Sequence, residues 1–212
     1  MIGLDLVTRV WRRLAAGDAT SLEQLVEVGF VAVDLETTGL DPRRDAIVAV
    51  AAIPFERGMA RAGLVTLVNP GRAIPPESTA IHGIDDAAVR EAPPIGDVVP
   101  RLDAVCARRV VVGHDVAFDL AMLTAARTLP QGMAPRLALD TRRLARALRF
   151  RDTRLEELAP QLGVPMVGRH SADGDARMTG EILLALVPAL RRHGVRTVGE
   201  LLRLQRATLA YD

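Results

Sequence analysis

Short apolar runs alternate with amphipathic stretches along this chain, a pattern typical of an α/β fold. Three runs rich in β-branched residues predict strands over residues 30–36, 46–55 and 63–68. The turn residues around Gly58 favour an antiparallel meander for these three strands. Two later runs, 110–113 and 137–139, predict short strands that alternate with helices and therefore run parallel.

Helical periodicity and capping patterns account for most of the remaining chain. Helices are predicted over 4–16, 21–28, 94–108, 115–129, 141–150, 153–162, 172–193 and from 197 onward, with 70–84 as a proline-rich loop. Capping-box patterns begin at Ser21, Thr153 and Thr197. Asp115 is expected to cap its helix by accepting backbone N–H groups, and Pro188 to kink the long helix.

These elements predict an α/β protein with a mixed sheet, made of a three-strand antiparallel meander plus parallel strands and flanked by helices. We expect a main domain over 29–193, preceded by an N-terminal helical extension over 1–28 and followed by a C-terminal helix within 194–212. At 212 residues, with 49% of them apolar, the chain can build one sizeable core.

Composition restricts the compartment more than the function. The single cysteine, Cys106, excludes an internal disulfide and fits a reducing, cytoplasmic environment. Charges interrupt the first apolar stretch, so we expect no signal peptide, and no run is long enough to suggest a membrane protein. The net charge of +1 indicates nothing about partners.

The first strand carries two acids near its end. Side chains two residues apart in a strand share a face, so Asp34 and Glu36 lie together while Val33 and Leu35 face the other way. Two neighbouring carboxylates at the end of a buried strand repel each other unless a cation lies between them. This pair therefore predicts half of a divalent-metal site.

Two later segments offer the other half. Asp119 falls near the first turn of a predicted helix after an apolar strand, and Asp175 falls in the first turn of the long helix, with His170 in the loop before it. Sites in α/β sheets gather where strands end and helices begin. Taken singly, each signal is weak, since a strand-edge acid is commonly solvated and an acid in a first helical turn complements the helix dipole. Their combination and order carry the prediction.

Four segments together resemble a known family: VDLETTGL, IHGI, GHDVAFDLAML and HSADGDA. They are similar to the motifs of the DEDD 3′–5′ exonucleases, in the branch with a catalytic histidine, and most of all to the proofreading epsilon subunits of bacterial DNA polymerase III. The resemblance covers roughly residues 29–190. It implies a ribonuclease H-like fold and a metal-dependent hydrolase that releases nucleoside 5′-monophosphates from DNA 3′ ends, single-stranded or frayed, in proofreading or repair.

The resemblance also implies a role for each matching residue. Asp34, Glu36, Asp119 and Asp175 would bind two divalent ions, with Mg²⁺ favoured over Mn²⁺, and His170 would be the general base. A second set would contact the substrate: Thr37 at the terminal 3′-hydroxyl, Leu40 against the last base, Phe118 as a stacking surface, with His82 and His114 as further contacts. Phe118 as a plain core residue is an equal alternative.

Asp115 departs from the family pattern, which commonly has Asn there, and would add a carboxylate near the phosphates. Two other functions stay open from the sequence. One is an exoribonuclease of the same fold, although the chain has few aromatic side chains for stacking RNA bases. The other is a non-catalytic module that associates with a polymerase subunit, which would not need four converging acids.

Overall fold

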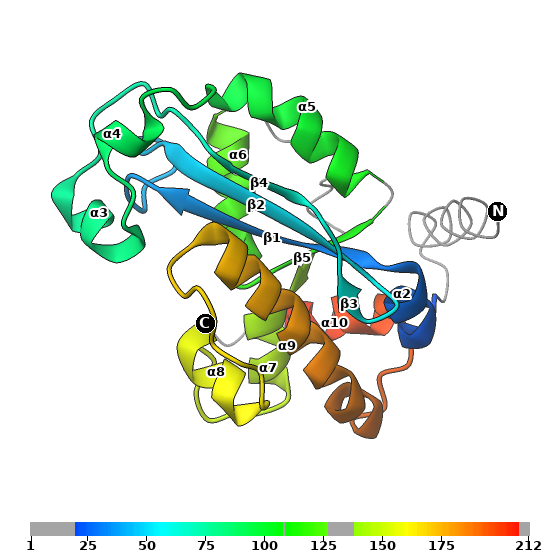
Figure 1. Ribbon diagram of the computed structural model, residues 1–212. Helices are drawn as coiled ribbons and strands as arrows, with labels where there is room; N and C mark the ends of the chain where they lie inside the picture. Colours follow the sequence, from blue (N-terminus) through cyan, green and yellow to red (C-terminus); the bar gives the residue numbers. More distant parts are fainter. Residues whose placement is uncertain (1–19, 108, 127–137, 208–212) are drawn as a thin grey trace.

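The computed structural model describes residues 20–107, 109–126 and 138–207, and within them a mixed six-stranded sheet lies between two helical layers (Figure 1). The strands are β1 (Phe30–Thr37), β2 (Ile47–Glu56), β3 (Met59–Ala60), β4 (Leu64–Leu67), β5 (Val110–Gly113) and β6 (Leu139–Asp140). The strand order is β3-β2-β1-β5-β6, and β4 pairs with β2.

The predicted meander is confirmed, because β1, β2 and β4 pair antiparallel in sequence order. Arg57 and Gly58 have positive φ angles at the turn into the additional short strand β3. The parallel part is confirmed as well, since β5 pairs parallel with β1 and with β6. β1 is therefore central, with both kinds of neighbour: it pairs with β2 from Phe30 to Thr37 and with β5 only over Phe30–Ala32, so its acids lie beyond the end of the parallel pairing.

The helices of the described ranges agree with most of the periodicity. They are α2 (Leu22–Val28), α3 (Pro76–His82), α4 (Asp86–Val89), α5 (Ile95–Cys106), α6 (Val116–Ala125), α7 (Thr141–Ala147), α8 (Leu155–Gln161), α9 (Ala172–Arg192) and α10 (Val198–Ala207). The helix predicted over 4–16 and the end of the one predicted over 115–129 lie outside the described residues. None of the helices in the described ranges is long and apolar enough to cross a membrane.

One prediction about helices is wrong. The 70–84 segment is not all loop, because α3 forms within it with Pro76 at its first position, where a missing N–H costs nothing. Gly83 ends that helix in the left-handed conformation. Pro188 lies within α9, which runs for 21 residues to Arg192, and a kink at this residue stays a prediction.

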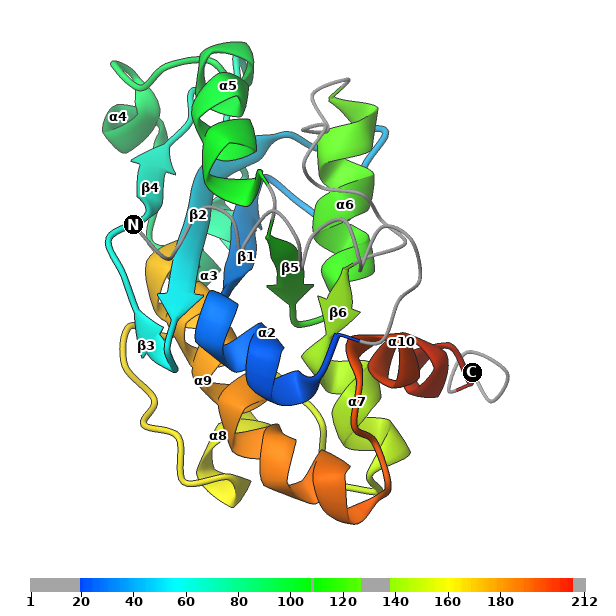
Figure 2. The same ribbon diagram turned by 90° about the vertical axis from the view of Figure 1, so that its right-hand side faces the viewer.

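The residues of β1 divide between two cores, which fixes the direction of its acids. Phe30 and Ala32 pack in the cluster that includes α9, whereas Val31, Val33 and Leu35 pack in the cluster that includes α5 and α6. Strand alternation then places Asp34 and Glu36 on the α9 side. Figures 1 and 2 show α9 on one face of the sheet and α5 and α6 on the other.

The flanking helices α2 and α10 belong to the same core as α9. The capping boxes predicted for both helices are present, and Ser21 pairs with Thr197 as an isolated bridge. Gln205 of α10 accepts a hydrogen bond from the Asp140 N–H at 3.0 Å and donates one to the Ala138 carbonyl at 2.8 Å. Figure 2 shows α10 beside β6 and α7.

Candidate active site

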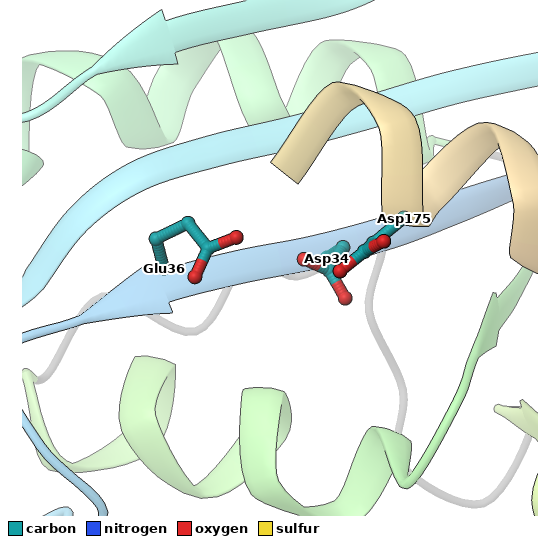
Figure 3. A group of neighbouring side chains, drawn as sticks. All are labelled: Asp34, Glu36 and Asp175. Atoms are coloured by element: carbon teal, nitrogen blue, oxygen red, sulfur yellow. The ribbon is translucent and has the colours of Figure 1, made fainter. Parts of the chain in front are cut away.

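Three carboxylates meet at the carboxyl half of β1. Asp34 and Glu36 come from the strand and Asp175 from α9, and one oxygen of each lies within 4.8 Å of the others (Figure 3). The strand alternation supplies two of the three, and α9 packs across the same face to supply the third. Oxygens this close, from three negative groups, form a binding site for a hard cation.

Asp175 is held by the way α9 begins. The Ser171 side chain caps the helix by accepting a hydrogen bond from the Gly174 N–H at 3.2 Å. The first turn lies so close to the preceding loop that a Cβ on Gly174 would be 2.0 Å from the Gly168 carbonyl oxygen. This packing leaves Asp175 5% exposed, and its Oδ1 atom has no hydrogen-bond partner. A buried acceptor of this kind fits a cation ligand.

Asp119 approaches Asp34 from α6. It is in the first turn of that helix, is 4% exposed, and its carboxylate is a hydrogen-bond acceptor for the Leu35 backbone. Its negative charge is the strongest of the neighbouring charges that raise the pKa of Asp34. Asp119 thus contacts the β1 backbone one residue after Asp34 and acts on Asp34 by its charge, but it is not one of the three residues whose oxygens lie within 4.8 Å of one another.

Burial and mutual repulsion dominate the electrostatics of this group. Burial first, and then the charges of Asp119, Asp175 and Glu36, raise the pKa of Asp34. Burial and the charge of Asp175 raise the pKa of Glu36 to about 7. Arg169 opposes both shifts and forms an ion pair with Asp175. Among the described residues, Arg169 is the guanidinium that opposes these shifts, and one positive charge leaves four acids short of compensation, so the residues fit divalent metal ions.

The raised pKa of Glu36 predicts how Glu36→Gln changes stability with pH in the metal-free protein. A folded-state pKa of about 7, above the ordinary value of 4.5, means that folding favours the protonated acid. The stabilisation that the protonated Glu36 side chain gives to the fold is complete below pH 4.5, the ordinary pKa of a glutamate, and is lost as pH rises through about 7. In EDTA, the melting temperatures of wild type and Glu36→Gln should agree at about pH 4, and the variant should become increasingly the more stable up to about pH 8. A difference that is constant over this range would contradict the assignment.

His170 lies beside the acids on the loop that precedes α9. Its backbone is in the left-handed conformation, with φ of 63°, and its side chain is exposed. Burial raises the pKa of Asp175, and Arg169 and then His170, through a charge interaction and a backbone hydrogen bond, oppose that shift. The imidazole is thus next to the carboxylate group without belonging to the protein core, which suits a group that exchanges protons with solvent or substrate.

Two residues that the sequence reasoning missed hold this loop. Arg169 Nη2 lies 3.1 Å from an oxygen of Glu156 on α8, and its other terminal nitrogen pairs with Asp175. Arg169 therefore connects α8 to α9 immediately before His170. Its position next to His170 in the sequence was the available signal. Only the fold shows that Glu156 lies opposite.

The predicted substrate residues fall into two groups around the acids. Leu40 is 83% exposed on the loop after β1, and Thr37 is 9% exposed with its hydroxyl donating to the Gly39 carbonyl at 2.7 Å. Phe118 is partly buried against the α5 and α6 core, so part of its ring stays exposed and neither the stacking role nor the core alternative is decided. Substrate contact by these three residues stays a prediction.

The two histidines are more enclosed. His82 Nδ1 accepts a hydrogen bond from the Ile84 N–H at 3.1 Å, and burial lowers the pKa of His82 against the opposing effect of the Thr37 backbone. The His114 Nδ1 atom lies 2.9 Å from the Thr141 hydroxyl, and burial lowers the pKa of His114 to about 4. Both side chains are therefore tied to protein groups, and substrate contact by either stays a prediction.

Two capping predictions near the site are wrong. Asp115 occupies the N-cap position of α6 in a left-handed conformation without a side-chain cap bond, because its carboxylate pairs with Arg142. That pair compensates the extra negative charge at this position. Thr153 does not cap α8, which begins after Arg154, and Glu156 is engaged by Arg169 instead. In both cases a charged partner from another segment competes with the local backbone.

Comparison with known proteins places this geometry in a family. A family model described as exonuclease, RNase_T, matches residues 31–183, which include every acid of the site. The chain belongs to this exonuclease family. It is also 32% identical over 166 residues to the DNA polymerase III subunit epsilon of Treponema pallidum, with 76% of this chain and 77% of that protein covered.

Two further similarities concern a larger protein and a solved structure. A DNA polymerase III subunit epsilon-like protein of Rhodobacter capsulatus is 39% identical over 198 residues, which cover 89% of this chain and 28% of that protein. A structure of Exonuclease X in complex with 5′ overhanging duplex DNA aligns with a TM-score of 0.64 and 26% identity, over 83% of this chain and 99% of that one. The fold is thus the ribonuclease H-like mixed sheet.

The chain spans only part of the first relatives it matches. It covers 28% of the Rhodobacter protein, 29% of a putative bifunctional exonuclease/endonuclease of Mycobacterium tuberculosis, and 13% of a PolC-type DNA polymerase III of Thermotoga maritima. In each, the similarity is confined to an exonuclease-sized portion. The substrate and partners of this chain are therefore argued from its own site.

Proposed function

We propose that this chain is a metal-dependent 3′–5′ exonuclease that hydrolyses DNA from the 3′ end to nucleoside 5′-monophosphates, in proofreading or repair. The observation that carries the proposal is the convergence of Asp34, Glu36, Asp119 and Asp175 from three elements, with His170 beside them. A phosphodiester resists attack because its negative oxygens repel the nucleophile. A group of carboxylates is suited to this reaction when it holds cations.

The acids would hold two divalent ions, with Mg²⁺ preferred because it takes oxygen ligands. Asp34, Glu36 and Asp175 would hold one ion, and Asp34 with Asp119 the other. When bound, the ions supply the positive charge that activates water and stabilises the leaving oxygen. Asp175 would bind through Oδ1, which has no hydrogen-bond partner, while its Oδ2 keeps the ion pair with Arg169.

His170 would accept the proton from the attacking water. Its side chain is exposed and borders Asp175, so a water at the acids would lie within its reach. The Arg169–Glu156 ion pair fixes the loop one residue away. His170 therefore combines a positioned backbone with a side chain that can return its proton to solvent.

The 3′ end of the DNA strand would be bound by the residues that surround the acids. The Thr37 backbone would contact the terminal 3′-hydroxyl, Leu40 would lie against the last base, and Phe118 would offer the exposed part of its ring for stacking. His82 and His114 would support this surface. The solved structure of the similar Exonuclease X contains duplex DNA with a 5′ overhang, that is, a recessed 3′ end.

We further propose that the chain acts in the cytoplasm with a DNA polymerase. The similarity to subunits named epsilon of DNA polymerase III supports a polymerase as the partner. The free and buried Cys106 suits a reducing compartment.

The proposal is tested on matched oligonucleotides labelled at the 5′ end. With Mg²⁺, a DNA strand should shorten stepwise to yield nucleoside 5′-monophosphates, and EDTA should stop the reaction. RNA of the same sequence should be degraded at least about tenfold more slowly. A phosphate on the DNA 3′ end should inhibit digestion, because Thr37 would lack its hydroxyl partner.

Two results would redirect the assignment. Faster digestion of RNA would favour the exoribonuclease alternative. No digestion of either strand, together with no binding of Mg²⁺ or Mn²⁺ by calorimetry at millimolar concentration, would favour a non-catalytic module. The crowded carboxylates argue against that module, because burial and repulsion make them costly for the fold.

A further inference from the structure

The loop that joins β1 to β2 has hydrogen bonds on both sides of the exposed Leu40. Leu40 is 83% exposed, four residues after Glu36. A flexible loop would allow such a side chain to fold back onto neighbouring apolar surface. Single exposed leucines are common on proteins, so exposure alone has no functional meaning. The bonds on either side of Leu40 supply the second observation.

One carboxylate makes the bonds on both sides of Leu40. Asp45 Oδ1 accepts a hydrogen bond from the Thr38 hydroxyl at 3.1 Å, and Asp45 Oδ2 accepts one from the Asp41 N–H at 2.9 Å. Thr38 precedes Leu40 by two residues and Asp41 follows it directly. Asp45 therefore fixes the chain before and after the exposed leucine, so that Leu40 is at the outer end of a closed turn.

The space inside this turn is filled by the same carboxylate. A Cβ on Gly39 would lie 2.5–2.7 Å from the atoms of the Asp45 carboxylate, so only glycine permits this approach. The Thr38 hydroxyl also accepts from the Ala46 N–H at 3.0 Å, and the Thr38 carbonyl accepts from the Ser78 hydroxyl of α3 at 2.8 Å. The turn is thus bonded to β2 and to α3 as well as to itself.

We infer that Asp45 is a positioning residue for the end of the DNA substrate: it holds Leu40 rigid so that its side chain can separate the terminal base from its neighbour or its partner strand. The inference rests on the proposed function and adds a residue to it. A side chain that separates bases must keep its position against the base that it displaces. A loop that is already fixed by hydrogen bonds holds the side chain there, whereas a flexible loop would move away. The effect of Asp45 should then depend on Leu40 and be largest where a base pair must be opened.

The test is a double-mutant cycle of Asp45→Ala and Leu40→Ala, with kcat and KM measured on single-stranded DNA and on a fully paired 3′ end. Each single variant should lower kcat/KM on the paired end by about tenfold and on single-stranded DNA by less than about threefold, mainly through KM. The double variant should be no slower than the worse single variant, because Asp45 acts through Leu40. Calorimetric Mn²⁺ binding should equal that of wild type.

The matched control is Glu200→Gln on α10. Glu200 also accepts two backbone hydrogen bonds, from Arg196 at 2.7 Å and Thr197 at 3.0 Å, but belongs to a helix start distant in sequence from the β1–β2 turn. It should lower thermal stability as Asp45→Ala does and leave the ratio of paired to single-stranded rates unchanged. If Asp45→Ala does not fold, Asp45→Asn, which can keep one of the two bonds, replaces it in the cycle.

The outcomes separate this inference from the proposed function. The role of Asp45 would be overturned if the losses in kcat/KM of the two single variants multiplied in the double variant, or if each variant lost as much on single-stranded DNA as on the paired end. Digestion by the wild type would still support the exonuclease assignment in either case. Absence of digestion by the wild type would overturn the exonuclease assignment first, and the role of Asp45 with it.

Discussion

Asp34→Asn should abolish nuclease activity and, in the absence of metal, stabilise the fold. Asp34 lies beside Glu36 and Asp175, and its pKa is raised by burial and by the charges of Asp119, Asp175 and Glu36. Asparagine keeps the shape and removes the charge, which relieves this repulsion at neutral pH. It also removes the ligand common to both proposed ions. We expect a loss of at least about a thousandfold in kcat/KM, or roughly 4 kcal/mol of transition-state stabilisation.

Two measurements check this prediction together. Melting in EDTA should give a higher melting temperature for Asp34→Asn than for wild type, and Mn²⁺ should raise the melting temperature of wild type alone. Asp173→Asn is the matched control, because Asp173 is in the first turn of α9 like Asp175, but its carboxylate pairs with Arg177 at 2.8 Å. It should retain full activity. Retention of activity within about tenfold by Asp34→Asn would contradict the site assignment.

His170→Ala should reduce kcat by about 10²–10⁴-fold while leaving metal binding intact, because the side chain transfers a proton and holds no ion. The exposed imidazole lies beside Asp175, and the loop is fixed independently through Arg169 and Glu156. Single-turnover rates on 3′-labelled DNA measure the chemical step, and calorimetry with Mn²⁺ measures the ions. Added imidazole should restore part of the rate to the variant, since it can take the same proton.

A histidine at the opposite end of the same helix provides the control. His193 is the C-cap of α9 and is exposed, so His193→Ala should digest DNA at the wild-type rate. Equal rates for His170→Ala and wild type would assign proton acceptance to solvent and remove His170 from the proposed chemistry. Loss of Mn²⁺ binding in His170→Ala would indicate that the loop as a whole had moved.

The carboxylate group was predictable because its members occupy regular elements. The alternation of β1 determines that Asp34 and Glu36 share a face, and the structure places them on the α9 side as that alternation requires. Asp119 and Asp175 lie in first helical turns, where the rules of helix starts apply. The strands of the meander and Val110–Gly113 followed from apolar runs for the same reason.

The two failed capping predictions share a different cause. Asp115 and Glu156 were expected to serve their own helix ends, and each is engaged by an arginine from elsewhere in the chain, Arg142 and Arg169. Local propensity describes what a side chain does when only its neighbours are available. A guanidinium that the fold brings near a carboxylate offers a stronger bond than a backbone N–H.

The sequence by itself determined the strand alternation, the order of the helices and the residue types of a metal-dependent nuclease, because these depend on periodicity and chemistry within short segments. The tertiary structure decided that oxygens of Asp34, Glu36 and Asp175 come within 4.8 Å of one another, and that a single guanidinium, Arg169, compensates one of the acids. It also decided that Asp45 closes the turn under Leu40. Such contacts depend on how distant elements pack, and packing is a property of the whole chain.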